Sequence, residues 1–276
     1  MKSFLSTLAT AFVCFLSVNT YAQHEVVKLW QTDSLLKTPE SVLYDAKDKV
    51  LYVSNINGDA SVKDGNGSIG KVGLDGKIIN VNWVTGLDAP KGLGRYKNFM
   101  YAADISGVAE IDIAKGTIIR KIPIEGSVFL NDITVDSKGV VYVSDSRTNK
   151  VHRIENGVVS TYGENLKGAN GVLAVGTDLY VLASGTLVKI SADKKQTTIA
   201  TGMDSGTDGL EMVKENEFLA TSWSGILYYV TGDKVQTLFD TRSTKTNSAD
   251  IGYDAVHKIV YVPTFARNSI MAYQLK

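Results

Sequence analysis

One pattern repeats six times along this chain and restricts the folds open to it. The first copy is PESVLYD at 39–45 followed by VLYVSN at 50–55, two apolar segments joined by a short turn. The later copies pair residues 90–93 with 100–104, 130–136 with 141–145, 169–172 with 179–182, 207–210 with 218–221, and 248–251 with 260–263. Successive copies begin about 40 residues apart, the length of a four-stranded propeller blade.

Each copy also carries candidates for a third and a fourth strand. The candidates for the third strand alternate apolar and polar residues, and they are 70–74, 107–113, 150–154, 187–190, 226–230 and 269–275. Candidates for the fourth strand include 77–84 and 234–239. The sixth copy ends at Lys276 without one, so we expect residues 25–30 to fill that place and close the ring. The prediction is an all-β, six-bladed β-propeller with the last blade closed by the N-terminal strand. Two stacked β-sandwiches would not explain the regular period.

Residues 1–22 are typical of a secretory signal peptide. Lys2 supplies a positive charge, an apolar run follows from Phe4 to Val18, and residues 20–22 offer a cleavage site before Gln23. The alternative, an uncleaved anchor, would need about 20 apolar residues. We therefore expect an exported protein, periplasmic or secreted, with residues 23–276 as one domain. The one cysteine, Cys14, lies in the leader, so no disulfide stabilises the mature chain.

The charge balance narrows the classes of partner. Lys and Arg number 29, Asp and Glu also 29, and the formal net charge is zero. Nucleic-acid and anionic-membrane binders need a basic excess, so neither is expected. No later segment is apolar for long enough to span a membrane. We expect a monomer that acts on a small molecule.

Aligning the first strands brings one residue of each copy to the hub of the propeller. These six residues, called the hub ring here, are Glu40, Lys91, Asn131, Asn170, Asp208 and Ala249. Any one of them alone would be an ordinary turn residue. Together, two carboxylates and two carboxamides around one axis form an all-oxygen ligand set, which suits Ca²⁺, Mg²⁺ or Mn²⁺ rather than a structural zinc.

The blade signatures PESVLYD, LNDITVDSKGVVYVSD, ANGVLAV and TDGLEMV resemble those of the regucalcin/gluconolactonase family of six-bladed propellers. The resemblance covers essentially the whole mature chain. It implies a divalent metal, with Ca²⁺ expected and Mg²⁺, Mn²⁺ or Zn²⁺ as alternatives, bound by Glu40, Asn170 and Asp208. It also implies that Asn131 faces the metal or the substrate, that Asp208 is the general base, and that the substrate is a lactone or related ester.

No other catalytic machinery competes with this assignment. The chain lacks a G-x-S-x-G nucleophile elbow. Its three histidines, His24, His152 and His257, fall outside the hub ring, and we expect them at the surface or at strand edges. The ion would polarise the carbonyl while Asp208 positions or deprotonates the attacking water.

Two residues depart from the family pattern. Family members that act on sugar acids carry an arginine two residues before the blade-three Asn, where this chain has Phe129, so a more apolar lactone or ester is expected. Lys91 would repel a nearby cation. Its side chain either extends into solvent or pairs with Glu40 or Asp208 in place of the metal. The second arrangement would make a non-enzymatic propeller that binds a small molecule, a sugar or a partner protein.

Three further features have structural explanations as well as functional ones. Trp223 follows the second strand of blade five, where it packs between blades or lines the substrate mouth. The loop 57–67 is expected to overhang one end of the channel and to shape a pocket. Asp132 and Asp250 stand one position beyond the hub ring, where we expect solvated or turn-capping carboxylates in preference to a second, deeper ion.

Overall fold

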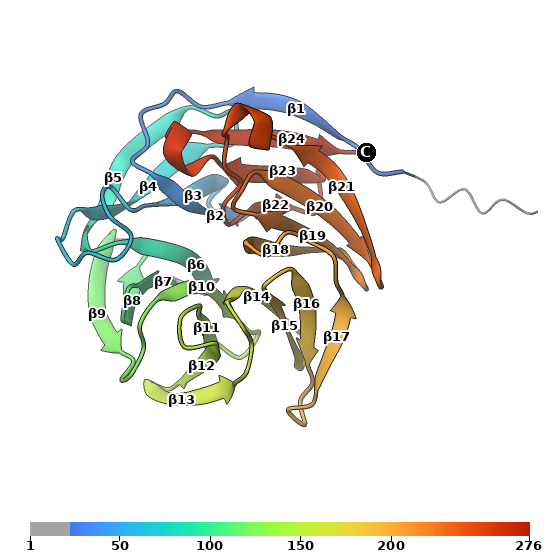
Figure 1. Cartoon of the computed structure of the whole chain (residues 1–276). Coiled ribbons are helices and arrows are strands. Elements are labelled where there is room, and N and C mark those ends of the chain that lie inside the picture. The colour runs from blue at the N-terminus through green and yellow to red at the C-terminus, as the bar shows by residue number, and fades with distance from the viewer. Residues whose placement is uncertain (1–22) are drawn as a thin grey trace, which may run out of the picture.

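Six four-stranded antiparallel sheets stand around a common axis in the computed structural model, which describes residues 23–276 (Figure 1). The predicted signal peptide lies outside the described residues. Blade one is β2 (Pro39–Asp45), β3 (Val50–Asn55), β4 (Gly67–Gly73) and β5 (Ile78–Leu87). Blade two is β6 (Pro90–Tyr96), β7 (Phe99–Asp104), β8 (Gly107–Asp112) and β9 (Thr117–Pro123). Blade three is β10 (Leu130–Val135), β11 (Val141–Asp145), β12 (Lys150–Glu155) and β13 (Val158–Gly163).

The second half of the chain repeats this plan. Blade four is β14 (Ala169–Val175), β15 (Asp178–Ala183), β16 (Thr186–Ile190) and β17 (Gln196–Ala200). Blade five is β18 (Thr207–Lys214), β19 (Glu217–Ser222), β20 (Ile226–Thr231) and β21 (Lys234–Asp240). Blade six is β22 (Gly252–Asp254), β23 (Ile259–Pro263), β24 (Ile270–Leu275) and β1 (Val26–Gln31). Two short 3-10 helices, η1 (Arg242–Thr244) and η2 (Phe265–Arg267), lie in loops.

The N-terminal strand closes the ring, as the sequence predicts. Strand β1 pairs antiparallel with β24, from Val26 opposite Leu275 to Gln31 opposite Met271, and Figure 1 shows the two strands side by side. The backbone N–H of Lys276 continues this pairing by donating to the carbonyl of Glu25. Strand β1 thus supplies the outermost strand of the last blade from the other end of the chain. This pairing holds the first and last blades together and stabilises the closed ring.

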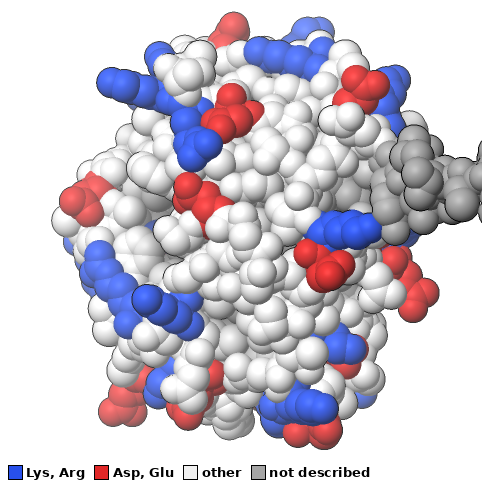
Figure 2. Space-filling model, turned by 45° about the vertical axis from the view of Figure 1, so that its right-hand side comes forward, with Lys and Arg blue, Asp and Glu red and all other residues white. Residues whose placement is uncertain are grey.

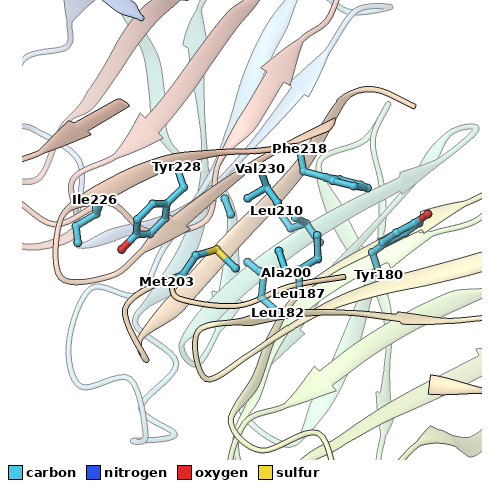
Figure 3. Close-up of a cluster of buried hydrophobic side chains, with 11 residues drawn as sticks. Tyr180, Leu182, Leu187, Ala200, Met203, Leu210, Phe218, Ile226, Tyr228 and Val230 are labelled. Atoms are coloured by element: carbon cyan, nitrogen blue, oxygen red, sulfur yellow. The ribbon is translucent and has the colours of Figure 1, made fainter. Parts of the chain in front are cut away.

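Six large apolar clusters lie each between two neighbouring blades, and a small seventh contains Ile56, Ala89 and Ile105. Figure 3 shows the one between blades four and five, where Leu182 and Leu187 meet Phe218 and Val230. Side chains alternate between the two faces of each strand, and both faces of every blade are covered by a neighbouring blade. The core is therefore divided into layers between blades. Each blade therefore depends on its neighbours for burial.

A β-bulge at the same place in five blades positions the hub ring. In blade one the ladder pairs Pro39 with Asn55 and then Val42 with Val53, so the first strand carries one extra residue at Glu40-Ser41. The same irregularity recurs in blades two to five. A bulge bends its strand and re-aims the side chain at that point. Here it turns the hub-ring residues out of the sheet, and five of the six line one axial pocket.

The amides freed by the bulges have partners on the neighbouring strand. The N–H of Ser41 donates to Ser54 Oγ at 2.8 Å, and the N–H of Gly209 donates to Thr221 Oγ1 at 2.8 Å. In blade three Ser144 Oγ takes the same role. Because buried N–H groups need acceptors, the hydroxyls near the ends of β3, β11 and β19 help to fix the bulges.

Charged side chains are scattered over the face shown in Figure 2 in small groups of both signs, without a continuous basic patch. Among residues 23–276, no helix is long and apolar enough to span a membrane.

Candidate functional site

Five members of the hub ring line one pocket at one end of the axial channel. The pocket has a volume of about 360 Å³, and Glu40, Lys91, Asn131, Asn170 and Asp208 form its floor. Ala249 is fully buried and does not reach the cavity. The structure thus brings together residues separated by up to 168 positions in the chain, the interval from Glu40 to Asp208.

The floor carries buried oxygen atoms without partners. Glu40 Oε2, Asn131 Oδ1 and Asn170 Oδ1 are buried and accept no hydrogen bond. The two amide nitrogens are engaged, because Asn131 Nδ2 donates to Ser146 Oγ at 3.1 Å and Asn170 Nδ2 donates to Asp208 Oδ1 at 2.9 Å. Buried polar atoms in folded proteins are almost always satisfied. Three oxygens left open at one place are the donor set that a hard cation would complete.

The surroundings of the two floor carboxyls, Glu40 and Asp208, disfavour their ionised forms and raise both pKa values. Burial raises the pKa of Glu40 well above its ordinary value, repulsion from Asp208 and Asp250 adds to this, and Lys91 opposes it. Burial also raises the pKa of Asp208, with a further contribution from Asp250, while the hydrogen bond from Asn170 lowers it. A cation bound between the two would favour both ionised forms.

More acidic groups lie beyond the floor. Asp132, Asp250 and Glu211 line a second cavity of about 220 Å³, which shares no lining residue with the first. Burial raises the pKa of Asp250 to about 6 and that of Glu211 to about 8. Including Glu40 and Asp208, five acidic side chains are therefore gathered near the hub, and Lys91 is the basic residue of the ring.

Asp132 and Asp250 do not take the solvated or turn-capping role that the sequence predicts. Their exposed fractions are 5% and 7%. Asp132 accepts hydrogen bonds from the N–H groups of Ile133 and Val172, and Asp250 accepts one from Ser41 Oγ at 2.5 Å. These bonds tie blade three to blade four and blade six to blade one. The two residues therefore stabilise the contacts between blades at the hub.

Lys91 follows neither of the arrangements predicted for it. Its side chain is 1% exposed, so it does not extend into solvent. Among residues 23–276, no carboxylate oxygen lies within the 4.0 Å limit of an ion pair with its ammonium, so it does not pair with Glu40 or Asp208. Instead the ammonium donates to the carbonyls of Ala60 and Ala89, both at 3.2 Å, and lies 4.3 Å from the centre of the Phe129 ring.

The bond to Ala60 ties Lys91 to the loop between β3 and β4. This loop overhangs the pocket, as predicted, and Ala60 lines it. Burial lowers the pKa of Lys91, and the charge of Arg147 adds to this, whereas Glu40 and Asp104 act in the opposite direction. The backbone carbonyls give the ammonium the acceptors that it needs without using the floor oxygens.

A second set of pocket residues comes from the turn after the second strand of each blade. Ladder pairing places Ile56, Ile105, Ser146, Ser184, Trp223 and Phe265 at equivalent positions, called the mouth ring here. Four of them, Ile56, Ser146, Trp223 and Phe265, line the pocket. Trp223 was singled out from the sequence, but Ile56 and Phe265 were missed. An alignment of the repeats at the ends of their second strands, in addition to their first strands, would have found both.

The histidines take no part in the pocket. His257 is exposed beside Asp254, and His24 stacks on Tyr229 with ring centres 3.8 Å apart. The expectation of a surface or edge position is wrong for His152, which is 6% exposed. Its place on β12 opposite the fully buried Val143 directs it into the interior. None of the three lines the floor or the walls.

The described residues offer few acidic ligands for a metal ion at the floor. Among residues 23–276, no three His, Cys, Asp or Glu side chains converge in a way that would hold a metal. A cation at the floor would therefore depend on two carboxylates together with the carboxamides of Asn131 and Asn170. That composition fits a hard, oxygen-preferring ion and does not fit a structural zinc site.

Comparison with solved structures identifies the architecture. A streptogramin B lyase aligns with a TM-score of 0.69 at 13% identity, over 92% of this chain and 98% of the lyase. A structure described as a gluconolactonase by family aligns with a TM-score of 0.67 at 14% identity, over 93% of each chain. The fold is that of a six-bladed β-propeller.

A third match extends the comparison within this propeller fold. Virginiamycin B lyase from Staphylococcus aureus, in a variant inactivated by replacing a histidine and solved with quinupristin, aligns with a TM-score of 0.66 at 13% identity, over 91% of this chain and 99% of the lyase. No family model and no curated protein matches the chain. At these identities the likeness establishes the propeller architecture alone.

Proposed function

We propose that this protein is an exported hydrolase of lactones or related esters that depends on a divalent cation, with Ca²⁺ as the expected ion. The observation that carries the proposal is the cluster of unpartnered buried oxygens of Glu40, Asn131 and Asn170 beside the carboxylate of Asp208. The structural likeness to a gluconolactonase-type propeller agrees with it.

The residues of the floor would divide the work as follows. Glu40, Asn170 and Asp208 would hold the cation, which would supply polarisation of the substrate carbonyl when bound. Asn131 lines the same cavity, and its unpartnered carbonyl oxygen would be available to the ion or the substrate. Its amide is held by Ser146, so the orientation of the group is fixed before substrate arrives.

Asp208 is the proposed general base. Its carboxylate lies at the floor of the pocket, and the hydrogen bond from Asn170 at 2.9 Å fixes its orientation, as a general base requires. In the hydrolysis the water oxygen bonds to the carbonyl carbon while Asp208 takes the proton. The bond from the acyl carbon to the ring oxygen then breaks, and the same proton passes to the departing alkoxide.

Two alternatives have less support. A propeller in which Lys91 replaces the metal requires a contact between its ammonium and a floor carboxylate, and the ammonium is bound to carbonyls instead. A lyase that depends on a histidine, by analogy with the virginiamycin B lyase, would need a histidine at the pocket, and none of the three lies there.

The test combines metal content, stability and activity. Elemental analysis after dialysis should find about one divalent ion per chain, and a chelator should abolish hydrolysis of a lactone and ester panel until Ca²⁺ is restored. Asp208→Asn should lose at least ~100-fold in kcat with folding intact, because general-base catalysis typically contributes 10²–10⁴-fold. Asp233→Asn, at an exposed turn, is the matched control. Full activity in the presence of a chelator would rule out the metal-dependent reaction.

A further inference from the structure

The walls of the axial pocket differ in chemistry from its floor. Apart from the floor residues Glu40, Lys91 and Asp208, no charged side chain lines the cavity in the described part of the chain. The apolar lining consists of Ile56, Ala60, Phe129, Trp223 and Phe265. A ligand whose reacting carbonyl lies at the floor would thus place the rest of its structure against apolar and aromatic surface.

One wall is an aromatic pair from blades five and six. Trp223 and Phe265 are equivalent residues of the mouth ring, and their rings meet edge to face at 5.5 Å and 78°. Trp223 is 47% exposed, although it is a large apolar residue. An exposed tryptophan at the rim of a concave pocket is typical of a ligand contact, since it gains favourable burial when the pocket fills.

The backbone holds both aromatic residues in place. The N–H of Trp223 donates to the carbonyl of Gly206 at 2.8 Å, and Asn247 donates to the carbonyl of Trp223 at 2.9 Å. Phe265 has a φ of 46°, a left-handed conformation that is costly for a bulky residue. Buried hydrogen bonds between Thr264 and Ser269 maintain it. Strain of this kind concentrates at functional sites, and a wall ordered in advance favours binding.

The opposite wall is Phe129, and the cations near it are already engaged. Lys91 Nζ lies 4.3 Å and Arg147 Cζ 4.7 Å from the centre of its ring. The Lys91 ammonium also donates to two carbonyls, and Arg147 Nη2 reaches Ser61 Oγ at 3.4 Å. Arg147 is exposed and does not line the cavity. Among residues 23–276, Lys91 is thus the one cation that lines the pocket, and two of its three N–H donors are already used by backbone carbonyls.

Hydroxyl-rich ligands would find few partners on these walls. Ser146 Oγ already donates to the carbonyl of Ala169 at 2.7 Å and accepts from Asn131. Thr207 Oγ1 accepts from the N–H of Gly185. Among the hydroxyl side chains of the walls in residues 23–276, only that of Ser205 forms no hydrogen bond within the protein. A sugar hydroxyl buried without a partner loses free energy relative to water.

We propose that the pocket selects an uncharged lactone or ester whose non-reacting part is an aromatic ring or a compact branched alkyl group, held between the Trp223–Phe265 pair and Phe129. This inference rests on the proposed function, because that function places the reacting carbonyl at the floor. The volume of about 360 Å³ lies at the small end of the usual range for ligand pockets, about 300–1,000 Å³, which suits a compact molecule.

The kinetic test compares three γ-lactones that share one ring: one bears a phenyl group, one bears hydroxyls, and one bears a carboxylate. The whole chain should show kcat/KM at least tenfold higher for the phenyl lactone than for the other two. Trp223→Ala and Phe265→Ala should lower kcat/KM for the phenyl lactone at least tenfold more than for the hydroxylated lactone. Phe99→Ala, on β7 outside the pocket, is the matched aromatic control. Preference for the hydroxylated or acidic lactone would overturn the inference while leaving hydrolysis established.

A binding test separates this inference from the reaction. The probe is the phenyl-substituted γ-lactam, which resists hydrolysis, with a hydroxylated lactam as its counterpart. The phenyl lactam should quench tryptophan fluorescence in the whole chain, and Trp223→Phe should remove the quenching although Trp30 and Trp83 remain. Quenching without any lactone hydrolysis would uphold the ligand class and contradict the proposed reaction. Equal affinity for both lactams would contradict the ligand class.

Discussion

The side-chain amide of Asn170 donates a hydrogen bond to Asp208 Oδ1 at 2.9 Å, while its own carbonyl oxygen is buried without a partner. The two residues come from neighbouring blades, and the bond fixes both orientations. Asn170 therefore has one atom that serves the proposed base and another that is open to a cation. This double role leads to the first prediction.

Asn170→Ala should weaken binding of Ca²⁺ at least ~10-fold, because it removes one oxygen ligand and the donor that orients another. The measurement is the rise in Tm on adding Ca²⁺, which reports binding to the folded state. Asn82→Ala, at an exposed position of β5, serves as the control. An unchanged rise in Tm would remove Asn170 from the metal site.

Lys91→Met should tighten Ca²⁺ binding about tenfold, because it removes a buried positive charge that faces the same cavity. It should also release the loop between β3 and β4, since the bond to Ala60 is lost. The two readouts are calcium titration and hydrogen exchange over residues 57–66. Lys115→Met is the control, because Lys115 is exposed beside Asp112, lies outside this loop and does not line the pocket. Unchanged calcium affinity would show that Lys91 does not act on the bound ion.

Stability should fall as the pH rises toward 8, and Glu211 should account for part of the fall. Burial raises the pKa of Glu211 from 4.5 to about 8, with a further contribution from Asp250. Between these values the folded chain binds more protons than the unfolded chain. The stabilisation is therefore fully present below pH 4.5 and is lost as the pH rises through 8, on the order of a few kcal/mol.

Glu211→Gln should flatten this dependence in urea unfolding at pH 5, 7 and 9. The free energy of unfolding at pH 9 should then exceed that of the parent protein. Glu125→Gln, at an exposed turn, should leave the dependence as it is. If Glu211→Gln and its parent lose stability in parallel between pH 5 and 9, Glu211 does not titrate in that range.

Gly209→Ala should destabilise the propeller by roughly 1–3 kcal/mol or more, the usual range for overpacking a filled interior. A Cβ at this position would lie 2.4 Å from the backbone nitrogen of Ile251 in the next blade. Gly206→Ala is the control for folding, since a Cβ there would lie 3.6 Å from its nearest neighbour, Asp204 Oδ1. Thermal unfolding compares the two. Equal Tm values would mean that the blades can separate at the hub at little cost.

The sequence predicted the blades well because each one is built from local contacts. Four strands of one blade are joined by short turns, so period, alternation and turn residues were enough to place them. The N-terminal strand was also predicted, since the sixth copy lacked a fourth strand. The ends of strands differ by a few residues, as for β5, which was expected at 77–84 and spans Ile78–Leu87.

The same reasoning placed five of the six hub-ring residues at one pocket, although it did not foresee the bulges that turn them there. It failed where the contacts are between blades. His152 was expected at the surface or an edge and is buried. Asp132 and Asp250 were expected to be solvated or turn-capping, and instead they hold neighbouring blades together. Such contacts depend on the spacing and tilt of whole sheets, which no single repeat encodes.

By itself the amino-acid sequence determined the six blades, the strand that closes them and the oxygen-rich character of the hub. The tertiary structure decided how Lys91 is satisfied, which oxygens remain open and which aromatic residues face the cavity. The physical reason is that hydrogen bonding within a blade follows from neighbours in the chain. The partners of a side chain at the axis, in contrast, come from distant segments that meet only when the ring has closed.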